Sequence, residues 1–266
     1  MSDSLRNLLF PGLTPARLLS ISAVLVAVAV FLVSSPLSPF ALWYADAQLG
    51  AGQADVAAAH YDAIARSNPS LAPTALRRSA QVWAVELRQP AGARRRMERL
   101  LAVGDAGLDR ARLEARIGTL LLREGRPRAA GRHFLAAFDE APDSKAAHRR
   151  LLAAAEAIDE SGDREDALAT WERLARAFPQ HAPRAAIARG DLALAQGHTE
   201  RALAMYEVAA AHGDGDLAAI GRLGSATCLE RLGSLDEAIA ELDAAELPSG
   251  VADSRIDGMR ARAARR

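Results

Sequence analysis

The sequence predicts an all-α protein with one N-terminal transmembrane helix followed by an α-solenoid of about six helix-turn-helix repeats. Two observations favour this fold. Residues 18–33 (LLSISAVLVAVAVFLV) form an uncharged apolar run near one end of the chain. After it, alanines, glycines and large apolar residues recur at intervals of 35–37 residues, which is typical of stacked helical hairpins. Because the chain is 50% hydrophobic but only 5% aromatic, we expect a core built mainly from small and aliphatic side chains.

The apolar run is expected to be an uncleaved membrane anchor. Thr14 can cap a helix and Pro15 suits its first turn, so the helix is predicted over residues 15–35. About 20 residues span roughly 30 Å, the thickness of a bilayer core. A cleaved signal peptide is the alternative, because residues 45–47 (ADA) have the form of a cleavage site. Their distance from the apolar run favours the anchor.

Charges around the predicted span orient it in the membrane. Arg6 and Arg17 precede the span, and the next basic residue after it is Arg66. The positive-inside rule therefore places residues 1–14 in the cytoplasm. We expect a single-pass protein of the inner (cytoplasmic) membrane, with everything after the span facing the periplasm or exterior.

Six alanines, here called the anchor alanines, mark the repeat. Their spacings are 36, 37, 37, 35 and 36 residues: Ala57, Ala93, Ala130, Ala167, Ala202 and Ala238. Five residues before them stand five glycines and one arginine: Gly52, Arg88, Gly125, Gly162, Gly197 and Gly233. Four residues after them stand large apolar side chains: Tyr61, Met97, Phe134, Trp171, Tyr206 and Leu242. Twelve residues after them stand helix breakers or turn formers: Pro69, Asp105, Pro142, Pro179, Asp214 and Gly250.

Each repeated position has a physical reason. Glycine ends a first helix because it adopts the left-handed conformation that closes a helical C-terminus. The anchor alanine lets the second helix approach the first closely, and the large residue then fills the space beside the crossing. Twelve residues before the anchors the side chains are small in five of six units: Ala45, Gln81, Gly118, Ala155, Gly190 and Ala226. Proline stops the second helix because it lacks a backbone donor.

This order of residues resembles the tetratricopeptide repeat family over residues 40–250. The closest matches are two consecutive units: Gly125, Ala130, Phe134 and Pro142, then Gly162, Ala167, Trp171 and Pro179. Two features depart from the family pattern. The intervals exceed the family's 34 residues, and Arg88 stands where the second unit should have glycine. We therefore predict a repeat domain over residues 36–250, followed by a polar closing helix or basic tail over residues 251–266.

The sequence offers no catalytic or cofactor-binding motif. Its net charge of zero argues against nucleic-acid binding, and its single cysteine, Cys228, excludes a Cys-based zinc site. His60 and His133 lie two repeats apart, too far to share a metal, and are expected at the surface. We expect no enzymatic activity, no cofactor and no bound metal.

The resemblance implies a right-handed superhelix whose first helices line a concave, partner-binding surface. Carried over onto the third and fourth units, the groove-facing positions are Arg112, Ala115, Thr119, Leu122, Arg123, Arg149, Leu152, Glu156, Asp159 and Glu160. The basic and amide clamp of the chaperone-binding branch of the family is missing from these positions. The charge is also divided by region: residues 77–132 carry 14 bases and 6 acids (net +8), and residues 191–243 carry 3 bases and 10 acids (net −7). Such a field can steer a partner.

The function expected from these features is that of a protein–protein interaction scaffold. It would be anchored in the inner membrane and assist assembly or translocation of envelope proteins, binding other proteins or peptides. The alternative is a structural subunit of an oligomeric envelope complex, built by packing of the repeats against other copies. The predicted span has no Gly-x-x-x-Gly pair that would favour dimerisation in the membrane.

Overall fold

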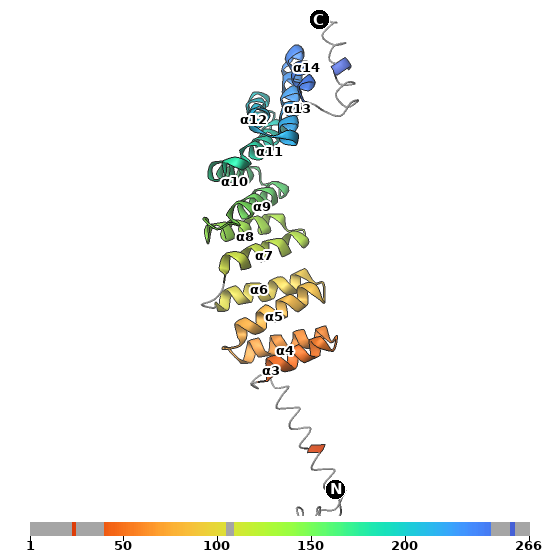
Figure 1. Ribbon diagram of the computed structural model, residues 1–266, viewed down its shortest axis with the longest axis vertical. Helices are drawn as coiled ribbons and strands as arrows, with labels where there is room; N and C mark the ends of the chain where they lie inside the picture. The colour runs from red at the N-terminus through yellow and green to blue at the C-terminus, as the bar shows by residue number, and fades with distance from the viewer. Residues whose placement is uncertain (1–22, 25–39, 105–108, 246–255, 259–266) are drawn as a thin grey trace, which may run out of the picture. The chain divides into compact units, whose positions relative to one another are not determined.

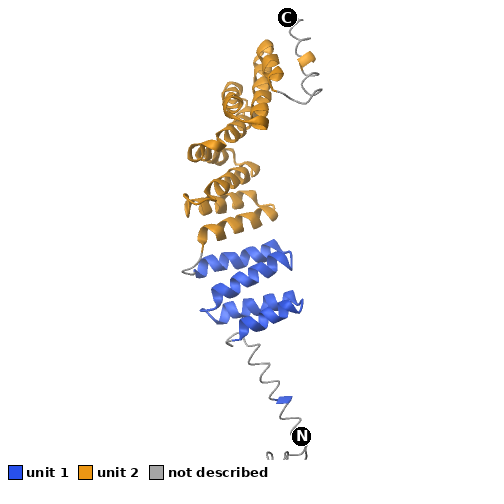
Figure 2. Ribbon diagram, viewed as in Figure 1, with its two compact units in different colours: residues 1–108 blue, residues 109–266 orange. Residues whose placement is uncertain are grey.

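The computed structural model describes residues 23–24, 40–104, 109–245 and 256–258, and the regular elements in these ranges are all helical (Figure 1). The helices from residue 41 onward form successive antiparallel pairs, each with a first and a second helix. Unit 1 (residues 1–108) holds two pairs: α3 (Ala41–Gly50) with α4 (Ala54–Ser67), and α5 (Ala72–Val85) with α6 (Pro90–Val103) (Figure 2). Unit 2 (residues 109–266) holds four: α7 (Arg110–Arg123) with α8 (Pro127–Asp139), α9 (Ala147–Glu160) with α10 (Arg164–Ala177), α11 (Ala182–Ala195) with α12 (Thr199–His212), and α13 (Gly215–Leu232) with α14 (Leu235–Asp243). A 3-10 turn, η1 (Pro179–His181), precedes α11.

The predicted membrane span lies almost entirely outside the described residues. Within it only Ala23 and Val24 are described, and both are helical. Across the described ranges, no helix combines the length and the hydropathy that crossing a bilayer requires. The anchor at residues 15–35 therefore stays a prediction, as does the right-handed superhelical twist.

The six predicted hairpin turns are confirmed by the backbone. The five glycines of the turn position all have positive φ, between 68° and 87°. Arg88 takes the same left-handed conformation, with φ of 51°, so the second hairpin turns without a glycine. In the first hairpin, Gln53 N–H donates to Gln48 O at 2.9 Å, a bond that closes the end of the first helix.

The core of each hairpin is the helix crossing that the sequence predicts. All six anchor alanines are fully buried, and the large residues four positions later are at most 8% exposed. A Cβ atom on Gly118 would lie 2.9 Å from the Phe134 ring, and one on Gly190 would lie 2.9 Å from the Tyr206 ring. These glycines are therefore needed so that the first helix leaves room for the aromatic ring of the second.

The second hairpin departs from the predicted register by one residue. Gln81, the expected crossing position, is exposed, while Ala80 is 1% exposed. The cause lies in the turn. Gln89 N–H donates to Trp83 O, six residues back, whereas Arg126 N–H in the third hairpin donates to Leu121 O, five residues back. The extra residue shifts α5 by one position, so Ala80 takes the place of Gln81.

A buried polar cluster joins the two hairpins of unit 1. The Asp62 carboxylate, on α4, accepts a hydrogen bond from Ser79 Oγ at 2.7 Å and another from Arg96 Nε at 3.2 Å. The Arg96 guanidinium also lies 4.2 Å from the centre of the Trp83 ring. Because both charges are largely buried, loss of one partner would leave the other uncompensated.

The end of unit 2 is covered by a residue beyond the last hairpin. Ile256 is 5% exposed and packs with Leu229 and Leu242 of the α13–α14 pair. Residues 251–255 and 259–266 lie outside the described part of the chain, so the polar closing helix or basic tail stays a prediction.

The turn at Arg88 predicts that Arg88→Gly stabilises the protein. A left-handed backbone conformation costs a non-glycine residue roughly 1–2 kcal/mol, and glycine removes this cost. Part of the gain is lost because glycine has more conformational freedom in the unfolded chain. We expect the free energy of unfolding to rise by about 0.5–1 kcal/mol, measured by urea denaturation. The matched control is Gly125→Ala, whose Cβ would meet nothing within 4 Å. That variant should lose stability through its backbone conformation alone, and an unchanged or lower stability of Arg88→Gly would contradict the assignment.

Candidate partner-binding groove

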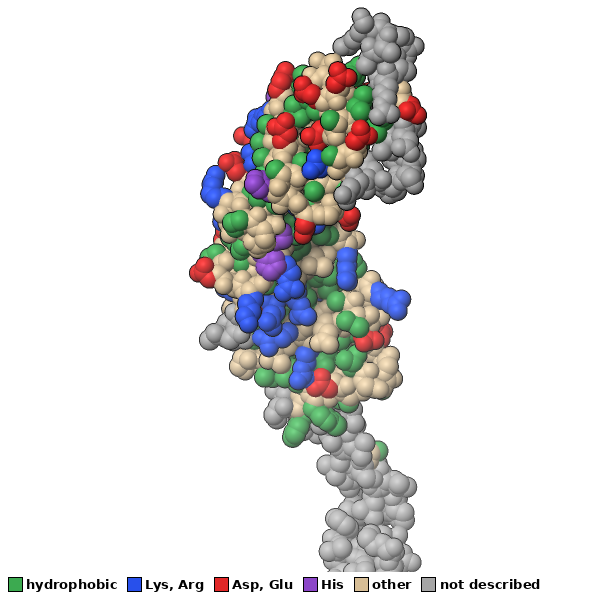
Figure 3. Space-filling model, turned by 45° about the horizontal axis from the view of Figure 1, so that its top comes forward, with side chains coloured by type: hydrophobic (Ala, Val, Ile, Leu, Met, Phe, Trp, Pro, Cys, Tyr) green, Lys and Arg blue, Asp and Glu red, His purple; other side chains and the backbone are tan. Residues whose placement is uncertain are grey.

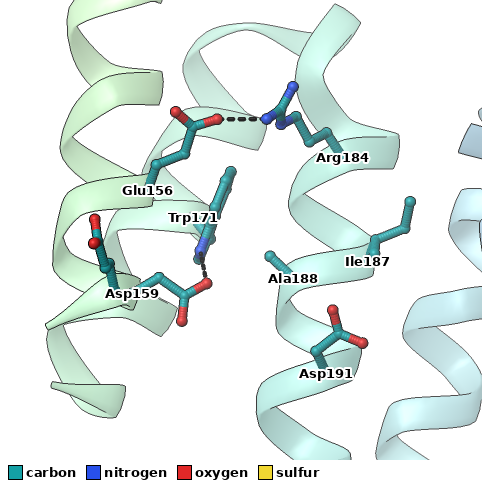
Figure 4. Close-up of a pocket in the computed structure, with 8 residues that line it drawn as sticks. Glu156, Asp159, Trp171, Arg184, Ile187, Ala188 and Asp191 are labelled. Atoms are coloured by element: carbon teal, nitrogen blue, oxygen red, sulfur yellow. Dashed lines mark hydrogen bonds and ion pairs between the residues drawn. The ribbon is translucent and has the colours of Figure 1, made fainter. Parts of the chain in front are cut away.

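An open groove of about 420 Å³ lies between the first helices α9 and α11 of unit 2 (Figure 4). We call it the α9–α11 groove. It is lined by four acids, one arginine and three apolar side chains: Glu156, Asp159, Glu160, Asp191, Arg184, Trp171, Ile187 and Ala188.

Helical spacing places these side chains on the groove. Glu156, Asp159 and Glu160 are separated by three and four residues, so they share one face of α9. The opposite face of α9 is buried, with Leu151 and Ala155 in the core of unit 2. Trp171 comes from the second helix α10, four residues after its anchor alanine, and its indole forms part of the groove floor.

Three of the four carboxylates are held by neighbouring side chains. Glu156 forms an ion pair with Arg184 across the groove at 2.5 Å. Asp159 accepts a hydrogen bond from Trp171 Nε1 at 3.2 Å, and Asp191 accepts one from the Tyr206 hydroxyl at 2.5 Å. Burial, followed by the bond to Asp191, raises the pKa of Tyr206 above its usual range, so the phenol remains a donor.

The groove has a surplus of negative charge. Four carboxylates face one guanidinium, so its formal charge is −3. Glu160 is exposed, and the described residues offer it no ion pair or hydrogen bond. Figure 3 shows further acidic side chains spread over the upper part of unit 2, consistent with the net charge of −7 over residues 191–243.

A smaller groove of about 200 Å³ has the same construction in unit 1. It lies between the first helices α3 and α5, and we call it the α3–α5 groove. Asp46 accepts a hydrogen bond from the Tyr61 hydroxyl and forms an ion pair with Arg78. Here two carboxylates, those of Asp46 and Glu86, face the Arg78 guanidinium, so the formal charge is only −1.

The predicted groove residues divide into two sets. Glu156, Asp159 and Glu160 line the α9–α11 groove. The other four, which are exposed on α7 and α9 but do not line it, are Arg112, Thr119, Arg123 and Arg149.

Contacts explain the conformations of two residues in the second set. Arg112 forms an ion pair with Asp109 at 3.3 Å, and the Thr119 hydroxyl donates to Ala115 O at 3.0 Å.

Sequence reasoning missed the α11 side of the groove. Arg184 lies 35 residues after Arg149, and Asp191 lies 35 residues after Glu156, which equals the repeat interval between these units. Carrying the groove positions one repeat further would have found both. Trp171 was predicted only as a packing residue, and its contact with the groove becomes visible once α10 is placed behind α9 and α11.

The two histidines expected at the surface, His60 and His133, are each partly exposed and partly covered by a neighbouring side chain. His133 Nδ1 lies 2.6 Å from Glu114 Oε2, and the His60 ring contacts the edge of Tyr44 with centroids 4.8 Å apart. Both side chains pack between the two helices of their own hairpin. Within the described ranges, no group of three or more His, Cys, Asp or Glu side chains is arranged to hold a metal ion. Cys228 is fully buried, which raises the pKa of its thiol.

Comparison with known proteins identifies the class of this repeat. Two tetratricopeptide repeat family models match the chain, over residues 151–181 and 187–252. These ranges include α10 and most of α9 and α11, the helices that form the groove, and Arg184 is the one groove residue outside them. The chain therefore contains tetratricopeptide repeats in these two ranges.

Solved structures resemble the chain at low identity. A structure of YrrB, described as a tetratricopeptide repeat protein with an unusual peptide-binding site, is 20% identical, with 72% of this chain and 94% of that chain covered and a TM-score of 0.47. PilW, described as a type IV pilus biogenesis factor, is 18% identical, with 81% and 96% covered and a TM-score of 0.47. PilF of Pseudomonas aeruginosa is 18% identical, with 84% and 96% covered and a TM-score of 0.45. No curated protein sequence matches the chain. These values are too low to carry a partner or a role from those proteins to this one.

The tyrosine at the α3–α5 groove predicts a loss of stability at alkaline pH. Burial, followed by the hydrogen bond to Asp46, raises the pKa of Tyr61 from 10.0 to about 12. Because the folded chain keeps this proton to a higher pH than the unfolded chain, the stabilisation is complete below pH 10 and is lost as the pH rises towards 12. Urea denaturation at pH 9 and at pH 11.5 measures how far the free energy of unfolding falls between the two pH values. This fall should be smaller for Tyr61→Phe than for the wild type. Equal losses would mean that this phenol does not contribute.

Proposed function

We propose that this chain is a protein–protein interaction scaffold that binds its partners through the exposed faces of its first helices. The observation that carries the proposal is the α9–α11 groove, in which charged side chains surround an apolar floor. Polar groups around apolar side chains are typical of sites that bind a specific ligand. The tetratricopeptide repeats support the same function, since stacked repeats create extended binding surfaces.

We further propose that residues 15–35 anchor this scaffold in the inner membrane and that the repeats face the periplasm or exterior. The support is the uncharged run at residues 18–33 and the two arginines before it. In this position the scaffold would assist assembly or translocation of envelope proteins. A structural subunit built by packing of the repeats against other copies is the alternative, and the mass of residues 40–266 in solution separates the two.

The orientation can be tested with reporters fused after Arg266. A reporter that is active only outside the cytoplasm should be active there, because the positive-inside rule keeps the N-terminal end in the cytoplasm. Activity of a cytoplasmic reporter alone at the same position would overturn the proposed topology.

Reversal of charge on the first helices should weaken partner binding without unfolding the chain. Arg112, Arg123 and Arg149 are exposed on α7 and α9, and exposed substitutions usually change stability by less than about 0.5 kcal/mol each. The triple Arg→Glu variant should melt like the wild type by circular dichroism, yet recover less partner from mild detergent at low salt, because charges at the edge of an interface mainly affect association.

The matched control for this variant places the same change on second helices. Arg164, Arg176 and Arg201 are exposed on α10 and α12. Their triple Arg→Glu variant carries the same net charge and should bind like the wild type. If both triple variants lose the same amount of partner, net charge is responsible and the first-helix surface is not the binding surface.

A further inference from the structure

The charge surplus of the α9–α11 groove exceeds what the hairpin architecture needs. Both grooves contain an aromatic ring that donates a hydrogen bond to a first-helix aspartate, and an arginine that pairs with an acid. In the α3–α5 groove these contacts leave a formal charge of −1, and in the α9–α11 groove they leave −3. Since unit 1 builds its groove without the additional carboxylates, packing alone does not account for them.

The positions of the acids along α9 also oppose helix stability. Glu156, Asp159 and Glu160 occupy the last turns of α9, which has no basic residue in its last turn. The C-terminus of a helix carries partial negative charge, so Asp159 and Glu160, which lie in the last turn, are unfavourably placed for helix stability. Asp191 lies in the C-terminal half of α11, which also lacks a basic residue in its last turn. The negative end of α9 and four carboxylates therefore share one groove.

The groove also has an apolar surface beside these charges. Figure 4 shows Trp171 between the acids of α9 and the α11 side chains Ile187 and Ala188. Ile187 and Ala188 are only half-buried, so an entering side chain can contact them. The groove thus offers carboxylates on both sides and a small apolar floor between them.

We propose that the α9–α11 groove binds an extended cationic segment of another protein, in which Arg or Lys side chains flank an apolar one. The apolar side chain would lie against Trp171 and Ile187. The cationic side chains would reach Glu160 on one side and Asp191 on the other, where an arginine can form paired hydrogen bonds with a carboxylate. This inference rests on the proposed scaffold function and specifies the chemistry of the partner at one of its surfaces.

The test measures binding of three fluorescein-labelled peptides to the full-length chain in mild detergent, by fluorescence anisotropy. The first peptide is Ala-Arg-Leu-Arg-Ala-Arg, the second has Glu in place of each Arg, and the third is the chain's own basic segment, residues 259–266 (MRARAARR). The first should bind saturably, and its Kd should rise at least fivefold when NaCl rises from 50 to 300 mM, because exposed charges are screened.

The decisive variant is Glu160→Lys. Glu160 is exposed and its replacement by lysine suits the C-terminal end of α9, so the melting temperature should stay equal or rise. The Kd of the first peptide should nevertheless rise at least fivefold. The matched control, Glu207→Lys, changes an exposed glutamate on the second helix α12 and should alter the Kd less than twofold.

Three results would overturn the proposal. They are equal binding of the acidic peptide, equal effects of the two Glu→Lys variants, and tighter binding of residues 259–266 than of the first peptide, which would assign the groove to the chain's own basic segment. If the peptides fail to bind while the Arg112, Arg123 and Arg149 variant still loses partner, the scaffold function stands and only the cationic partner is wrong.

Discussion

The close crossing of two helices at each anchor alanine is the contact on which the other features of the repeats depend. Small residues on both helices bring the backbones together, and the large side chain one turn later fills the adjoining space. In the fourth hairpin this arrangement lets the Trp171 ring reach past α9 to the groove and bond with Asp159. In the first hairpin Tyr61 reaches Asp46 in the same way. The packing and the floor of each groove are therefore made by the same residue.

Most of the fold could be predicted because each hairpin repeats the same local constraints. Glycine at the turn, alanine at the crossing and a large residue four positions later are all short-range requirements. The structure has the glycine in five hairpins and the other two features in all six. Arg88 shows the limit of this reasoning. The glycine expected at the turn is missing there, yet the backbone adopts the same left-handed conformation. Packing of the α5–α6 pair outweighs the free-energy cost of a left-handed backbone at an arginine. A sequence pattern does not show which of these two free energies is larger.

The candidate site was predictable in part. Glu156, Asp159 and Glu160 follow from their shared helix face, and Arg184 and Asp191 follow from the repeat interval once the pattern is carried into the fifth hairpin. The ion pair and hydrogen bonds between these side chains were not predictable, because they depend on the distance between neighbouring helices. The pairing of Glu156 with Arg184 and the bond between Tyr206 and Asp191 each join residues whose distance is set by packing. Four other residues predicted to face a groove are exposed on the first helices but do not line this one: Arg112, Thr119, Arg123 and Arg149.

The additional residue in the turn after α5 has a geometric consequence. An α-helix turns by about 100° per residue, so inserting or deleting one residue between two packed helices changes which side of the preceding helix faces its neighbour. In the second hairpin the insertion places Ala80 at the crossing and leaves Gln81 to line the α3–α5 groove. The longer turn thus determines which side chains of α5 face outward. The length of the turn in such a repeat therefore fixes the rotation of the first helix about its own axis. That rotation decides which of its side chains are exposed to a partner.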